Sequence, residues 1–175
     1  MSPNHSLIGE LKLEAANTRK MLERVPVDKN DWKPHEKSMK LGRLATHIAE
    51  LPGWITMTMM TDELDFEQFE YKQHMPATTE ELLAKHDENV AQAISILENA
   101  NYEDFDKMWT MRRGDHIFFT LPKKVVMRSF SFNHMYHHRG QLSVYLRLLH
   151  VPVPGIYGPS ADDVPVTTAD DVTAG

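Results

Sequence analysis

Cysteine is absent from this sequence of 175 residues. Its absence excludes disulfide bonds, thiolate zinc sites, iron–sulfur clusters and a cysteine nucleophile. The sequence also lacks a Gly-rich phosphate loop and a Ser in a Gly-x-Ser-x-Gly turn, so neither of those two chemistries is indicated. Any metal ion must therefore be bound by His, Asp or Glu side chains.

Long hydrophobic runs are missing as well. No stretch approaches the roughly 18 consecutive apolar residues that a membrane span requires. The segment Met1–Lys20 carries Glu10 and Glu14 and has no unbroken apolar core, unlike a signal or transit peptide. We therefore expect a soluble, cytoplasmic protein without a membrane partner.

Positive charge is scarce relative to negative charge. The chain has 19 Lys and Arg against 25 Asp and Glu, a net charge of −6, which disfavours nucleic acid as a partner. Basic residues nevertheless dominate residues 107–147, where Asp115 is the sole acid. This local bias indicates either a solvated face that attracts the acidic part of the chain or a site for an anionic ligand.

Apolar residues recur at helical spacing in four segments, which predict long amphipathic helices. These segments are residues 7–25, ended by Pro26; 41–60, bent at Pro52-Gly53; 78–97, opened by a Thr78–Glu81 capping box; and 123–150, which follows Pro122. Residues 108–111 and 117–120 flank Arg113-Gly114-Asp115 and predict a short hairpin between the third and fourth helices. The expected fold class is all-α, a single four-helix bundle with that hairpin, and three helices with an appendage is the alternative.

Three histidines form a candidate metal site. His134 and His138 lie four residues apart on the fourth predicted helix, so one helical turn stacks them on the same face. A third ligand must come from another helix, and His47 lies among apolar residues in the middle of the second. Three neutral imidazoles on facing helices would leave positions open for water or substrate, as catalysis requires. The alternative is that these are ordinary core or surface histidines.

Other metal-binding patterns fail. His35-Glu36 is not followed by the second histidine of a zinc-protease helix, and no Glu lies three residues before any His, as di-iron bundles require. The sequence therefore favours a mononuclear, all-histidine site for a divalent ion, with zinc or nickel as first candidates and iron or manganese next. His137 points away from the pair and is expected at the surface or in a dimer contact.

Longer stretches around these histidines resemble the DinB family, part of the wider DinB/YfiT-like group of metalloenzymes. The matching stretches are Trp32-Lys33-Pro34, Leu44-Ala45-Thr46-His47-Ile48, residues 133–142 (NHMYHHRGQL) and residues 151–162. The resemblance covers nearly the whole chain and implies a four-helix bundle, commonly a homodimer, with a divalent ion held by His47, His134 and His138. We expect one such domain over residues 1–166 and a flexible tail over residues 167–175.

The resemblance also implies a reaction class. Relatives in this superfamily include thiol S-transferases that use bacillithiol or mycothiol and a thiol-dependent maleylpyruvate isomerase. The function implied is a metal-dependent transferase in detoxification or stress response, acting on a small electrophile and a low-molecular-weight thiol. The alternatives are a metal-dependent hydrolase and a non-enzymatic metal-binding bundle that acts through dimer or protein contacts.

Three residues of the fourth helix are secondary candidates. Gln141 and Tyr145 share the predicted inward face of the histidine pair and could orient a ligand or donate a hydrogen bond to substrate, although Tyr145 also fits a plain core position. Arg139 points elsewhere, so a capping role or a dimer salt bridge is expected for it.

Overall fold

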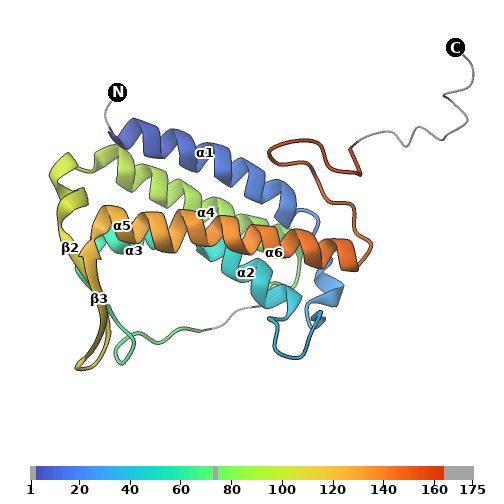
Figure 1. Cartoon of the computed structure of the whole chain (residues 1–175), viewed down its shortest axis with the longest axis horizontal. Coiled ribbons are helices and arrows are strands. Elements are labelled where there is room, and N and C mark those ends of the chain that lie inside the picture. Colours follow the sequence, from blue (N-terminus) through green and yellow to red (C-terminus); the bar gives the residue numbers. More distant parts are fainter. Residues whose placement is uncertain (1–2, 73–74, 164–175) are drawn as a thin grey trace, which may run out of the picture.

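The computed structural model describes residues 3–72 and 75–163. Its elements in chain order are α1 (Pro3–Leu22), η1 (Val27–Lys29), α2 (Leu41–Glu50), α3 (Gly53–Met60), β1 (Glu63–Asp65), α4 (Thr79–Asn99), η2 (Tyr102–Asp106), β2 (Met108–Arg113), β3 (His116–Pro122), α5 (Lys123–Met127), η3 (Arg128–Asn133) and α6 (His134–Leu148). The long helices run side by side and the strands lie at one end of them (Figure 1). Within the described part of the chain, no helix combines the length and apolar character needed to span a membrane. The predicted tail and the domain boundary at residue 166 lie outside the described residues.

The predicted second helix is divided into α2 and α3. Pro52 has no backbone N–H and cannot continue the helical hydrogen-bond ladder. Side chains of other elements contact the break: Asn89 Nδ2 donates to the Ala49 carbonyl and Ser131 Oγ donates to the Leu51 carbonyl, each at 2.9 Å. The Leu51 carbonyl also accepts a hydrogen bond from the Trp54 backbone N–H at 3.2 Å. The bend expected at Pro52-Gly53 is therefore confirmed, and side chains from α4 and η3 hold it in place.

The predicted fourth helix contains an unexpected π-helical turn, η3, between α5 and α6. A π-helical turn is one residue wider than an α-helical turn, so the residues after it are rotated by about 100° around the helix axis relative to an uninterrupted helix. Because η3 ends directly before His134, this turn sets the face on which His134 and His138 lie.

The core brings α2 and α6 face to face. Both helices contribute to one apolar cluster, and α2 also contacts α4. The fully buried members of this cluster from the two helices are Leu41, Leu44, Ala45, Ile48, Ala49, Leu142 and Leu146. A second cluster joins Leu11 of α1, Leu97 of α4 and Phe132 of η3. The packing of these apolar faces brings the middle of α2 against the start of α6.

The expected mostly helical fold with a hairpin is confirmed, but a pure all-α bundle is not, because the protein also contains a small three-stranded sheet. The strand order is β1-β2-β3, with β1 parallel to β2 and β2 antiparallel to β3. The β2–β3 hairpin is the predicted one, and its turn contains Gly114 at a φ of 54°, a conformation that favours glycine. Strand β1 was not expected, since three residues carry too little alternation to predict a strand.

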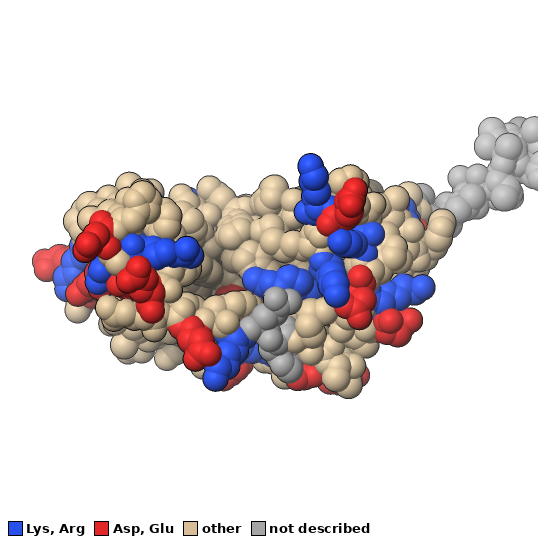
Figure 2. Space-filling model, turned by 90° about the horizontal axis from the view of Figure 1, so that it is seen from below, with Lys and Arg blue, Asp and Glu red and all other residues tan. Residues whose placement is uncertain are grey.

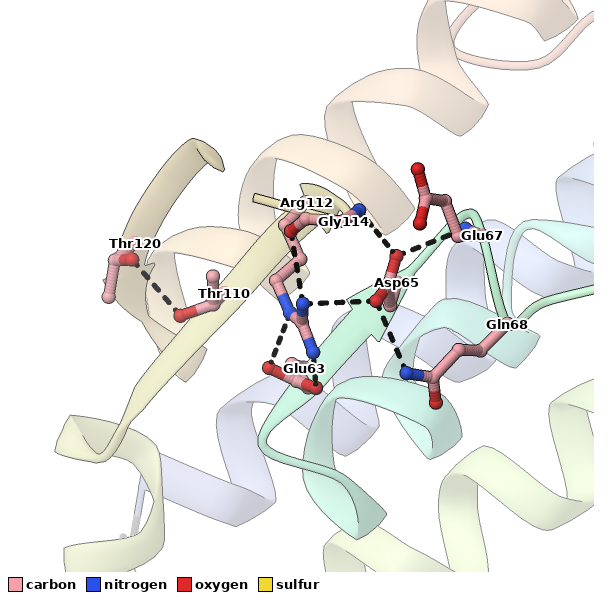
Figure 3. Close-up of polar contacts among 8 residues, drawn as sticks. All are labelled: Glu63, Asp65, Glu67, Gln68, Thr110, Arg112, Gly114 and Thr120. Atoms are coloured by element: carbon pink, nitrogen blue, oxygen red, sulfur yellow. Dashed lines mark hydrogen bonds and ion pairs between the residues drawn. The ribbon is translucent and has the colours of Figure 1, made fainter. Parts of the chain in front are cut away.

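A polar network joins β1 to β2 (Figure 3). The carboxylate of Asp65 accepts hydrogen bonds from the backbone N–H groups of Gly114 and Glu67, each at 3.0 Å, and lies 3.0 Å from Arg112 Nη1. These contacts hold the pKa of Asp65 below its usual value, and the hydrogen bond from the Gly114 backbone is the largest cause. Arg112 also donates two hydrogen bonds to Glu63, of 2.9 and 2.7 Å. The network fixes β1 on the hairpin and thereby positions the segment that follows β1.

Candidate metal centre

The three predicted ligands meet between α2 and α6. His47 Nε2 lies 3.3 Å from His134 Nε2, and His134 Nε2 lies 2.8 Å from His138 Nε2. One ring nitrogen from each histidine lies within 4.8 Å of the other two. The structure thus brings together the i, i+4 pair of α6 and the central histidine of α2.

This arrangement fits a single divalent ion. An ion about 2.0–2.1 Å from each nitrogen, with near-tetrahedral angles, places its ligand nitrogens roughly 3.3 Å apart. This matches the 3.3 Å between His47 and His134, and the 2.8 Å between His134 and His138 is shorter. Imidazole donors suit zinc, nickel and iron, so the donor set leaves the identity of the ion open. Among the residues that the structure describes, no fourth His, Asp or Glu joins the cluster. The triad therefore has the ligand number of a catalytic site.

Burial keeps the three imidazoles in the neutral form that binds metal. Burial, followed by the nearby charges of His138, His134 and Arg43, lowers the pKa of His47 to about 3. Burial is also the main cause that lowers the pKa of His134 and of His138; the hydrogen bond that His138 donates to Gln141 partly opposes this shift at His138. At neutral pH each ring is uncharged and has a nitrogen lone pair to donate.

Gln141 orients His138. Its Oε1 accepts a hydrogen bond of 2.7 Å from His138 Nδ1, and its Nε2 donates to His137 Nε2 at 3.0 Å. With the proton on Nδ1, Nε2 of His138 keeps the lone pair that faces the other two ligands. The expectation that Gln141 lies on the inward face is incorrect: it is exposed, because the buried stripe of α6 passes through Leu142. His137 is exposed, as expected for a surface residue.

Tyr145 belongs to the core. It is 9% exposed, its hydroxyl donates to the Met39 carbonyl at 3.1 Å, and its ring meets Trp32 edge-on with 5.6 Å between centroids. Of the two roles expected for Tyr145, its surroundings fit the core position.

Arg139 is buried and paired within the chain. Its Nη2 lies 2.7 Å from Glu14 Oε2, and its Nη1 donates to Thr18 Oγ1 at 3.1 Å. The Tyr157 hydroxyl accepts a further hydrogen bond from Nη2. The expected capping role or dimer salt bridge is thus replaced by an ion pair between α6 and α1, because a buried guanidinium needs a counter-charge inside the protein.

A cavity of about 480 Å³ lies beside His47. Its lining consists of Arg43, His47, Glu50, Gly53, Trp54, Met57, Leu64, Phe66, Phe69, Tyr71 and Asn89. A larger cavity of about 710 Å³ between α2 and α4 contains none of the three histidines. Seen from below, the surface is hollowed between the lobe at the sheet end and the rest of the molecule, with charged residues on both sides of the hollow (Figure 2). The smaller cavity is therefore the candidate substrate site.

Sequence reasoning missed the cavity residues. Arg43 and Glu50 lie four residues before and three residues after His47 on α2, so helical spacing could have placed them on its face. The aromatic residues after β1 gave no such signal, since their position depends on the pairing of β1 with β2.

Three histidines from two facing helices meet at one point, which is the arrangement of a helical metal-binding protein. The model of the DinB family matches residues 1–168, and the chain belongs to that family. It is 27% identical over 157 residues to the uncharacterized protein YrdA of Bacillus subtilis (strain 168), covering 87% of this chain and 86% of YrdA.

Two solved structures share the fold. A DinB-like protein of Bacillus subtilis, YjoA, has a TM-score of 0.67 and 17% identity, covering 89% of this chain and 99% of YjoA. A DinB-like protein of Bacillus cereus has a TM-score of 0.65 and 21% identity, covering 85% of this chain and 94% of its own. These two structures confirm the fold, and the match to the family model confirms the family resemblance of the sequence.

Proposed function

We propose that this protein is a metal-dependent enzyme that transfers a low-molecular-weight thiol to a small electrophile. The observation that carries the proposal is the convergence of three neutral imidazoles, from His47, His134 and His138, beside an apolar cavity. A site with three protein ligands retains positions for a reactant. Zinc or nickel is the first candidate for the ion, and iron or manganese the next.

The residues of the chain have separable tasks in this proposal. Burial keeps the three rings uncharged, and Gln141 holds His138 with Nε2 directed at the site. The apolar walls beside His47 receive the electrophile. When bound, a divalent ion supplies Lewis acidity that lowers the pKa of a thiol toward neutrality. In the transfer, the thiolate sulfur bonds to the electrophilic carbon, the leaving group departs with the bonding electron pair, and the thiol proton passes to solvent.

The proposal extends to a cytoplasmic homodimer that acts in detoxification or stress response. These parts rest on the resemblance to thiol S-transferases of the wider superfamily. Hydrolysis at the same site is the variant in which water replaces the thiol as nucleophile.

A second candidate function is a non-enzymatic metal-binding protein that acts through protein contacts. It is favoured by Ile117 and Phe118 on β3, which are 57% and 48% exposed. A closed shell with a fourth protein ligand would support it, whereas a bound water or reactant at the ion would support the enzyme.

Metal analysis of purified, untagged protein tests the proposal. We expect near one equivalent of metal in the parent and none in His47→Ala, His134→Ala or His138→Ala. His137→Ala is the matched control, since His137 neighbours the triad but is exposed, and it should keep its metal. Equal metal content in all four variants would refute the site. Loss of free thiol in the presence of monochlorobimane, with bacillithiol or glutathione as the thiol, then tests the reaction; activity that survives in the triad variants would contradict it.

A further inference from the structure

We propose that the substrate of this cavity is an apolar carboxylate, whose negative group binds Arg43 while its apolar body lies against the aromatic walls. This inference rests on the proposed function, because it assigns the cavity beside the candidate metal centre to the substrate.

Arg43 offers an unsatisfied hydrogen-bond donor in the cavity. It lies one helical turn before His47, and both side chains line the cavity. Its Nη1 atom is buried and has no hydrogen-bond partner within residues 3–72 and 75–163. Glu50 Oε2 lies 3.6 Å from this atom, close enough for an ion pair but too far for a hydrogen bond. A buried N–H without an acceptor is unfavourable, so a ligand that supplies the acceptor gains affinity.

The neighbours of Arg43 hold the guanidinium in place without satisfying it. The Tyr71 hydroxyl donates to both carboxylate oxygens of Glu50, at 3.1 and 2.9 Å. The guanidinium carbon of Arg43 lies 5.2 Å from the centre of the Tyr71 ring, a cation–π distance. Glu50 is thus engaged by Tyr71, and the planar guanidinium is preorganised for a second carboxylate, whose geometry it matches.

The rest of the lining favours an apolar ligand body. Trp54, Met57 and Leu64 line the cavity together with Phe66 and Phe69. Phe66 and Phe69 are 38% and 41% exposed, so part of the apolar surface of each ring is in contact with water. A ligand with an apolar body would remove this surface from water, and an uncharged analogue would leave the Arg43 donor unpaired.

A pair of probes that differ only in charge tests the inference. Binding of 4-phenylbutanoate and 4-phenylbutanamide is measured by isothermal titration calorimetry on metal-loaded and metal-free protein. We expect the acid to bind about tenfold or more tightly than the amide, from one hydrogen bond to a charged group. Arg43→Met should abolish this preference, and Glu50→Gln should strengthen it, because the competing carboxylate is removed. Arg24→Met, at an exposed position after α1, should retain it.

A carboxylate could also bind the ion directly, and His134→Ala separates the two cases. We expect the preference for the acid to persist in this variant. A preference lost in His134→Ala but kept in Arg43→Met would overturn the inference and leave the proposed metal enzyme intact. If the parent holds no metal, the proposed function fails, and the metal-free protein still tests Arg43. If Arg43→Met does not fold, Glu50→Gln replaces it as the test, and an unchanged affinity of Glu50→Gln for the acid would overturn the inference. Failure of both probes to bind the parent at millimolar concentration would also overturn it.

Discussion

The hydrogen bond from His138 to Gln141 gives a sharp test of the candidate metal centre. Replacing Gln141 by Leu removes the acceptor that lies 2.7 Å from His138 Nδ1 and keeps a side chain of similar size. Loss of such a partner of a ligand histidine weakens metal binding by about 10–100-fold, equivalent to about 1.4–2.7 kcal/mol. Since Gln141 is exposed, water can partly replace its Oε1, and we expect the lower end, about tenfold.

The assay is competition for zinc against a chromophoric chelator at pH 7. Gln92→Leu is the matched control, because Gln92 is also an exposed helical glutamine and its side chain contacts only Glu88 among the hydrogen bonds described. Gln141→Glu keeps an acceptor and should bind zinc at least as well as the parent. The melting temperature of the metal-free protein should change little in all three variants. Zinc affinity of Gln141→Leu within twofold of the parent would refute the orienting role.

Three further predictions concern stability. Arg139→Met should lower the free energy of unfolding, measured in urea, by about 3–5 kcal/mol, because it leaves the Glu14 carboxylate buried and unpaired. The control Arg147→Met, which breaks an exposed ion pair, should change this free energy little. Equal losses in the two variants would contradict the prediction. Burial lowers the pKa of His86 below 6.5, so the unfolded state binds more protons below that pH and the stability of the fold falls on acidification. His86→Asn should therefore show a shallower loss between pH 7 and pH 5 by urea denaturation, and an unchanged slope would count against it. Removal of metal by a chelator should lower the melting temperature of the parent but not that of His134→Ala, as monitored by circular dichroism.

The helices and the His134–His138 pair could be predicted because both depend on local spacing, whereas the addition of His47 rests on the packing of facing helices and on the family resemblance. The i, i+4 relation of His134 and His138 follows from helix geometry, and the stop at Pro52 follows from its missing N–H. The Thr78 side chain accepts a hydrogen bond from the Glu81 backbone at 3.1 Å, so the predicted start of α4 is confirmed.

The features that could not be predicted depend on partners distant in the sequence. Strand β1 exists because β2 pairs with it, and the partner of Arg139 lies on α1, at the other end of the chain. The π-helical turn η3 is stabilised by packing and by the contact of Ser131 with Leu51, neither of which leaves a pattern in the local sequence. The cavity combines residues from α2, α3 and the segment after β1, so its shape follows only from the assembled fold.

The position of the triad along the chain links metal binding to folding kinetics. His47 and His134 are 87 residues apart, so an ion held by both would close a loop that contains α3, α4 and the whole sheet. Closing such a loop is entropically costly in an unfolded chain and requires most of the native contacts first. The ligand set would then form late in folding and be lost early in global unfolding. Metal binding would then slow global unfolding more than it speeds the early steps of folding.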